Sequence, residues 1–177
     1  MMMVKVLYFG SFNPVHYGHT GIAGYVASMP EVERVLIIPT PHSPFKELSI
    51  LADPQKRLLQ VRAAFDGISP KITVSDIEYH LSDPLYTINT LHVIQEQDPT
   101  AELVLLMGAD NIGSIEQWHK GREILRDFRI WVYPRIGYDG ETFCRRYGTK
   151  TGIKGVRFLK DAPEFDISST AIRNASH

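Results

Sequence analysis

Residues 4–19 read VKVLYFGSFNPVHYGH and join an apolar run to a glycine-containing turn and two histidines. The run at 4–9 predicts a buried strand, and Gly10 ends it before a stretch able to form a helix. A helix start presents backbone N–H groups and the positive end of the helix dipole, which favour an anion. His16 and His19 are three positions apart, so both can lie on one face of the first turn. The stretch therefore predicts a phosphate-binding strand–turn–helix unit.

The histidine pair has two other interpretations. A His-x-x-His pair can belong to a metal site, but such a site needs a third ligand and usually a supporting carboxylate. The neighbouring sequence indicates neither of them. Both rings could also be purely structural. Phosphate contact is the preferred interpretation because an imidazole N–H donates to a phosphate oxygen, while Gly10 and Gly18 allow close approach.

Short apolar runs alternate with amphipathic stretches along the whole chain. Strands are predicted at 4–9, 34–38, 71–74, 102–107, 129–133 and 156–159, and helices at 20–28, from Asp53-Pro54 onward, at 87–97, 141–147 and 169–175. Thr87 is predicted to cap its helix, with Ile88, Leu91 and Ile94 on one face. The alternation predicts an α/β fold: a Rossmann-like, doubly wound, mainly parallel sheet with helices on both faces. Ligands of such sheets bind at the carboxyl ends of the strands.

The bulk composition is that of an ordinary globular protein. The 177 residues are 44% hydrophobic and 22% charged, so we expect one domain covering 1–177. A net charge of −1 gives no general case for nucleic-acid binding, and no apolar run is long enough to cross a membrane. Cys144 is the single cysteine and is interpreted as a filler or surface thiol in a helix. We expect a cytoplasmic protein. The sequence is compatible with a homo-oligomer but does not determine the oligomeric state.

A second anion-binding candidate lies near the other end of the chain. Ser168, Ser169 and Thr170 stand at a predicted helix start, where hydroxyl and N–H groups can cap the helix or contact an anion. Arg173 shares their face, and its guanidinium suits bidentate phosphate contact. An ordinary capped helix with a solvated arginine is the alternative.

Several further residues are weaker candidates. Gly108 and Asp110 follow the strongest strand, where Asp110 could bind a ribose or simply cap the next helix. Trp118 could stack on a flat heterocycle, although core packing would be favoured for it alone. Thr87 stands at a helix entry with free N–H groups, and Lys46 lies in the proline-rich loop at 40–50, where it could reach a phosphate or stay in solvent.

Together these segments resemble the nucleotidyltransferase superfamily. Residues 10–19 resemble its first signature, in which a His-x-Gly-His element contacts nucleotide phosphates, and residues 168–173 resemble its Ser-Ser-Thr-x-x-Arg signature. Within this superfamily, the chain is most similar to the nicotinate-nucleotide adenylyltransferases. The segments that indicate this are the proline-rich loop, residues 86–91, residues 108–111 and Trp118. Phe9 departs from the usual glycine, and Asn13 and Asn89 stand where aspartate is common.

The resemblance implies adenylyl transfer from ATP to nicotinate mononucleotide, with pyrophosphate as the second product. It assigns catalysis to His16, His19 and Arg173, and ATP binding also to Gly10, Ser11, Phe12, Gly108, Asp110, Ser168, Ser169 and Thr170. It assigns acceptor binding to Lys46, Thr87, Asp110 and Trp118. Mg²⁺ is expected on the ATP phosphates and water, with no protein metal ligand. A related transferase using nicotinamide mononucleotide or phosphopantetheine, or a non-catalytic nucleotide-binding module, is the alternative.

Overall fold

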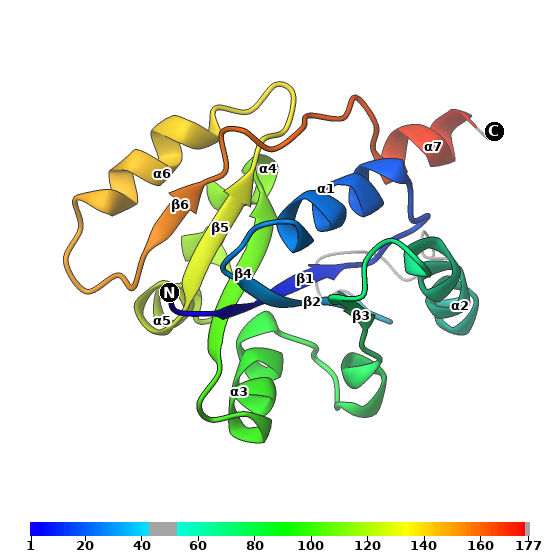
Figure 1. Cartoon of the computed structure of the whole chain (residues 1–177), viewed down its shortest axis with the longest axis horizontal. Helices are drawn as coiled ribbons and strands as arrows, with labels where there is room; N and C mark the ends of the chain where they lie inside the picture. The colour runs from blue at the N-terminus through cyan, green and yellow to red at the C-terminus, as the bar shows by residue number, and fades with distance from the viewer. Residues whose placement is uncertain (43–52, 176–177) are drawn as a thin grey trace.

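The computed structural model describes residues 1–42 and 53–175, in which a six-stranded parallel sheet has helices on both faces (Figure 1). The strands are β1 (Val4–Gly10), β2 (Val32–Pro39), β3 (Ile72–Val74), β4 (Glu102–Gly108), β5 (Arg129–Tyr133) and β6 (Val156–Phe158). The α-helices are α1 (Tyr17–Ala27), α2 (Pro54–Phe65), α3 (Thr87–Gln97), α4 (Ala109–Ile112), α5 (Gly121–Asp127), α6 (Gly140–Gly148) and α7 (Ser169–Ala175). Two 3₁₀ turns are η2 (Ile77–His80) and η3 (Ile115–Gln117).

The strand order is β3-β2-β1-β4-β5-β6, and every neighbouring pair is parallel. This order confirms the predicted Rossmann-like α/β fold. The chain winds outward in one direction from β1 to β3 and then in the other from β4 to β6. The direction therefore reverses between β1 and β4, and a crevice is expected at their carboxyl ends.

Alternating side chains of the strands build two cores, one on each face of the sheet. Val6 of β1 packs with Val26 of α1 and Val61 of α2 on one face. Leu7, the next residue, packs on the other face with Leu91 of α3 and Ile124 of α5. Because both faces are covered, the central strands are apolar without interruption, which is why they stand out in the sequence.

The start of α2 follows the local chemistry, whereas the start of α3 does not. The Asp53 side chain accepts a hydrogen bond from the Gln55 N–H at 2.9 Å, and Pro54 is the first residue of α2, as predicted. The prediction that Thr87 caps α3 is wrong by one position. Tyr86 is the capping residue, with an extended backbone, and Thr87 already lies inside the helix.

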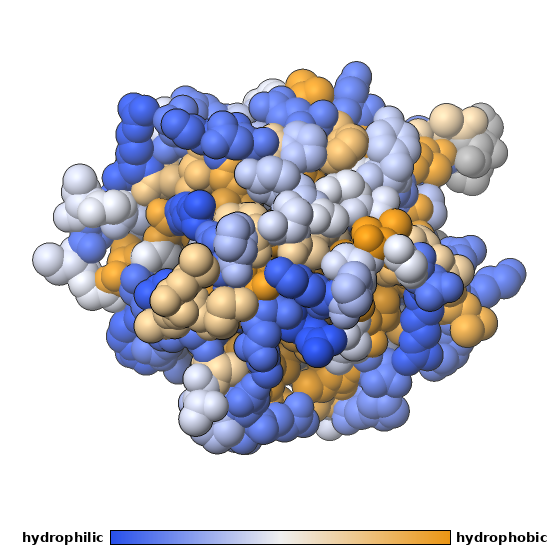
Figure 2. Space-filling model, viewed as in Figure 1, coloured by the Kyte–Doolittle hydropathy of each residue, from blue (hydrophilic) through white to orange (hydrophobic). Residues whose placement is uncertain are grey.

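The surface of the described residues carries mixed polarity. Figure 2 shows a face dominated by hydrophilic residues, with apolar side chains in separate patches between them. None of the helices in residues 1–42 and 53–175 has both the length and the apolar character of a membrane span. Cys144 is buried in α6, where burial raises the pKa of its thiol to about 11, in line with its interpretation as a filler.

Candidate active site

A cavity of about 260 Å³ opens where the winding direction of the sheet reverses. It lies at the carboxyl ends of β1, β4 and β5 and is closed on one side by the segment that leads into α7. Its lining includes Gly10, Ser11, Phe12, His16, His19, Asp110, Arg135, Ser168, Ser169, Thr170 and Arg173. The structure therefore brings into one cavity residues that lie as far apart in the chain as Gly10 and Arg173.

The two histidines cap the helix that carries them. The His16 Nδ1 accepts from the Gly18 N–H, and the His19 Nδ1 accepts from the His16 N–H, each at 3.1 Å. The two rings are stacked, with centroids 3.7 Å apart. A neutral imidazole that accepts at Nδ1 carries its proton on Nε2. The cap therefore sets both rings to the tautomer that donates through Nε2.

Gly18 is required by this arrangement. A Cβ atom at that position would lie 2.9 Å from the His16 ring and 2.9 Å from the Ile167 side chain. Both contacts are shorter than real Cβ atoms tolerate, so any larger residue would displace the capping histidine or the chain that leads into α7.

His16 is held in its neutral form. Burial, and then the positive charge of Arg135, lower the pKa of His16 to about 4. At neutral pH this ring therefore donates a hydrogen bond without carrying a charge, and the positive charge beside it comes from arginine side chains.

Helix α7 lies beside the start of α1 (Figure 1) and is tied to the turn after β1. The Ser168 Oγ accepts from the Ala171 N–H at 3.0 Å and caps the helix. The Ser169 Oγ donates to the Pro14 carbonyl at 2.7 Å. Arg173 donates to the Asn13 carbonyl and, at 3.1 Å, to the Thr170 Oγ. The two predicted signatures thus form one structural unit, while the catalytic roles of their side chains stay predictions.

Gly108 and Asp110 lie next to each other at the end of β4. Gly108 is the capping residue of α4, and a Cβ atom added to it would lie 2.3 Å from the Asp110 Oδ1 and 3.1 Å from the Arg135 Cγ. The absence of a side chain at Gly108 leaves the room in which the Asp110 carboxylate enters the cavity.

Of the predicted acceptor residues, Asp110 lines this cavity, whereas two others lie apart from it. Thr87 and Trp118 are not among its lining residues. The Tyr86 ring stacks on the His119 ring with centroids 4.0 Å apart, so the start of α3 and the segment after η3 are neighbours. The Trp118 Nε1–H donates to the Ser114 Oγ at 3.3 Å. Lys46 lies outside the described residues.

Arg135 is the functional candidate that the sequence analysis missed. It follows β5 and Pro134, lines the cavity, and donates to the Ile167 carbonyl at 3.1 Å. A lone arginine in a loop belongs to no recognised motif. Its position directly after a central strand is nevertheless the same signal that identified Gly108 and Asp110.

A buried tyrosine and a partly buried one lie beside Arg135 in the cavity lining. The Tyr8 O–H donates to the Tyr133 Oη at 3.3 Å, and both residues line the cavity. Burial raises the pKa of each phenol, so both hydroxyl groups stay protonated and serve as hydrogen-bonding groups. Both were assigned from the sequence to strands alone.

Comparison with known proteins agrees with this fold. Residues 7–175 match the model of the family described as cytidylyltransferase-like. Relatives described as "probable nicotinate-nucleotide adenylyltransferase" include one from Flavobacterium johnsoniae, 39% identical over 169 residues covering 96% of this chain and 84% of the relative. Another, from Christiangramia forsetii, is 41% identical over 171 residues covering 96% of this chain and 84% of the relative. The Plasmodium falciparum nicotinic acid mononucleotide adenylyltransferase complexed with NaAD has a TM-score of 0.80 at 17% identity, covering 97% of this chain and 83% of that one, and shows the shared fold.

Proposed function

The chain belongs to the cytidylyltransferase-like family and, within it, to the nicotinate-nucleotide adenylyltransferases, and from this premise we propose how its cavity carries out the reaction. The enzyme transfers the adenylyl group of ATP to nicotinate mononucleotide and releases pyrophosphate, a step of NAD biosynthesis. The observation that carries the proposal is the convergence of His16, His19 and Arg173 on one cavity.

The cavity suits the triphosphate of ATP. His16 and His19 donate through Nε2, while Arg173 and Arg135, which line the same cavity, supply positive charge. Hydrogen bonds from charged donors to phosphate oxygens are about twice as strong as neutral ones. The backbone at Gly10, Ser11 and Phe12 lies close to the ligand, and Ser168, Ser169 and Thr170 add hydroxyl groups. Gly108, also predicted to bind ATP, does not line the cavity and leaves room for Asp110.

The chemistry needs positioning more than proton transfer. A phosphate oxygen of nicotinate mononucleotide attacks the α-phosphorus of ATP, a new P–O bond forms, and the bond to the β-phosphate oxygen breaks. Pyrophosphate leaves with that electron pair. Because the attacking oxygen is already negative, no strong general base is required. His19 stabilises charge at the α-phosphate, and Arg173 stabilises the departing pyrophosphate.

Mg²⁺ fits the proposed site as a companion of ATP. The cavity has the Asp110 carboxylate in its lining, and Mg²⁺ keeps several water molecules and binds through one or two carboxylates plus substrate phosphates. When bound, the ion neutralises charge on the phosphate oxygens. Asp110 is the carboxylate in the cavity lining that would contact a water molecule of the ion, without a direct bond to the metal, or else a ribose hydroxyl.

The acceptor is proposed to lie toward α3 and η3. Trp118 stacks on the pyridine ring, and the start of α3 at Thr87 offers N–H and hydroxyl groups to the nicotinate carboxylate. Asp110 lines the cavity and is proposed to contact either substrate. Lys46 adds a positive charge in this proposal. A cytoplasmic location and a homo-oligomer stay predictions from the sequence.

A pyrophosphate-release assay tests the proposal. The purified chain is supplied with ATP, Mg²⁺ and one acceptor at a time: nicotinate mononucleotide, nicotinamide mononucleotide or phosphopantetheine. We expect the highest kcat/KM with nicotinate mononucleotide. A higher value with either of the other acceptors would reassign the substrate, and no pyrophosphate with any of them would overturn the proposed reaction.

A further inference from the structure

Arg57 is a fully buried cation that lies behind the wall of the cavity. It is in the first turn of α2 and has no exposed surface. Its Nη1 donates to the Ser11 carbonyl at 2.7 Å and to the Thr40 carbonyl at 2.9 Å. Its Nη2 donates to the Pro41 carbonyl at 2.8 Å. One guanidinium therefore joins α2 to the turns that follow β1 and β2.

Stability alone explains this burial poorly. Transfer of a charged side chain out of water carries a large desolvation cost, and burial lowers the pKa of Arg57 from its usual range. An apolar side chain of similar volume often serves a core equally well. An apolar side chain cannot form hydrogen bonds to the carbonyl groups of two separate turns. A planar guanidinium can, and it holds these carbonyl groups in fixed positions.

The contact with Ser11 orients a peptide group of the cavity. In a trans peptide the C=O and N–H groups point in opposite directions. Because the Ser11 carbonyl points to buried Arg57, the Phe12 N–H points away from it, and both residues line the cavity. Phe12 also has a φ of +49°, a left-handed conformation that is unfavourable for a bulky residue and needs surrounding contacts to persist.

We propose that Arg57 is a positioning residue that holds the Ser11–Phe12 peptide with its N–H directed at the nucleotide phosphates. The same guanidinium fixes the Thr40–Pro41 turn after β2, so the two turns keep one relative position. Arg57 acts through these backbone groups and does not itself contact the substrate. The inference rests on the proposed function, because it assigns the phosphate-binding role to the same cavity.

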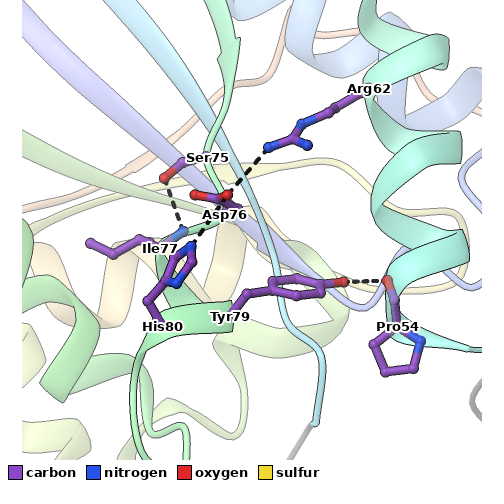
Figure 3. A network of polar contacts seen from close by, with 7 residues as sticks. All are labelled: Pro54, Arg62, Ser75, Asp76, Ile77, Tyr79 and His80. Atoms are coloured by element: carbon purple, nitrogen blue, oxygen red, sulfur yellow. Dashed lines mark hydrogen bonds and ion pairs between the residues drawn. The ribbon is translucent and has the colours of Figure 1, made fainter.

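The first turn of α2, from which the Arg57 side chain extends, is itself held by hydrogen bonds. The Tyr79 O–H of η2 donates to the Pro54 carbonyl at the start of α2 at 2.6 Å (Figure 3). The Asp53 side chain caps the same helix end. With its first turn held at both Asp53 and Pro54, α2 presents the guanidinium of Arg57 at a set distance from the Ser11 carbonyl.

Arg62 on the same helix supplies a matched control. It is half-exposed and donates to the Asp76 carboxylate at 3.4 Å (Figure 3). Neither residue lines the cavity. The test compares Arg57→Lys and Arg57→Met with Arg62→Lys and Arg62→Met. Each protein is checked by near-ultraviolet circular dichroism, then assayed for kcat and for KM of ATP and of nicotinate mononucleotide. The thermal shift caused by ATP is measured in parallel.

We expect Arg57→Met to lose about 100-fold in kcat/KM for ATP, since a displacement of about 1 Å at a reacting group has an effect of that order. Lysine keeps the charge but not the planar fork, so Arg57→Lys is expected to lose about 10-fold and to recover part of the ATP-induced thermal shift. KM for nicotinate mononucleotide and both Arg62 variants should stay near wild type. A role in stability alone would lower the melting temperature and leave the ATP kinetics of the folded fraction unchanged.

Two outcomes overturn the inference. In the first, a folded Arg57→Lys protein has wild-type kinetics and a wild-type ATP shift. In the second, neither Arg57 variant folds, which assigns Arg57 to stability. Both outcomes are separate from failure of the proposed function, in which the wild-type chain itself releases no pyrophosphate.

Discussion

The proposed nucleotide side and the proposed acceptor side of this chain are assembled in different ways. On the nucleotide side, side chains bond directly to the backbone of distant segments, as Ser169 does to Pro14 and Arg57 to Ser11. On the acceptor side, the start of α3 meets the segment after η3 through ring stacking of Tyr86 on His119. Directional bonds to fixed carbonyls preorganise a site, whereas stacked rings permit small shifts. We therefore expect variants on the first side to change kcat and variants on the second to change KM.

The largest effect should come from His19→Ala, which removes a donor proposed to contact the α-phosphate. We expect kcat to fall about 1,000-fold, as for the loss of one oxyanion donor. Pyrophosphate release measures this loss, and circular dichroism checks the fold.

His19→Gln is the matched control for capping. Glutamine at this helix position can still accept from the backbone N–H of the capping residue, so its stability should be close to wild type while turnover stays low. Near-normal turnover in either variant would exclude His19 from the phosphate site. It would also contradict the expectation that variants on the nucleotide side change kcat.

Arg135→Met should have the next largest effect. It removes a positive charge from the cavity, and we expect kcat/KM for ATP to fall about 100-fold. Because Arg135 lowers the pKa of His16, the variant should also raise that pKa, which NMR titration of the ring measures. Arg145→Met, in an exposed pair with Glu141 on α6, should change neither quantity. An unchanged His16 pKa would show that Arg135 acts elsewhere.

The pH dependence of stability gives a third test of the nucleotide side. The pKa of His16 is about 4 in the folded chain, below its ordinary value of 6.5, so between these values the unfolded chain binds more protons. Stability should fall as the pH drops from 6.5 to 4, by about 2 kcal/mol after an allowance for solvent screening. His16→Asn keeps a good capping residue and should lack this slope in urea unfolding. Equal slopes in the two proteins would contradict the burial of His16.

Trp118→Ala should have the smallest effect and tests the acceptor side. Loss of ring stacking should raise KM for nicotinate mononucleotide about 10-fold, with KM for ATP and kcat nearly unchanged. Trp118→Phe should restore most of the affinity. A lower kcat with an unchanged acceptor KM would show that Trp118 supports the nucleotide side, and the two-sided comparison would need revision.

Sequence patterns predicted the helices and strands whose local sequence preferences agree with their place in the fold. The strand at 129–133 and the helix at 169–175 have the predicted bounds, since a continuous apolar run and a Ser-Ser-Thr cap are unambiguous signals. Helix α5 was missed because its seven residues are too few to show a period, and Lys120 before it adopts a left-handed conformation that the sequence does not signal.

Site residues could be predicted from the sequence where they belong to a recognisable motif. They could not be predicted where their role depends on packing in three dimensions. His16, His19, Ser169 and Arg173 belong to recognisable signatures, and the structure brings them together. Arg57 and Arg135 have no signature, since their importance comes from which carbonyl or ring lies opposite them in three dimensions. Fully buried arginines are rare, so no composition rule would have selected Arg57.

The tie between α7 and the turn after β1 has a consequence for synthesis of the protein. Asn13 and Pro14 are synthesised well before the residues that hold their carbonyl groups, which follow 155 and 160 positions later. A nascent chain can complete the six described strands by Phe158 and still lack one wall of the cavity. Nucleotide binding should therefore begin only after α7 has been synthesised, and a stop codon before Ser169 should yield a folded sheet without activity.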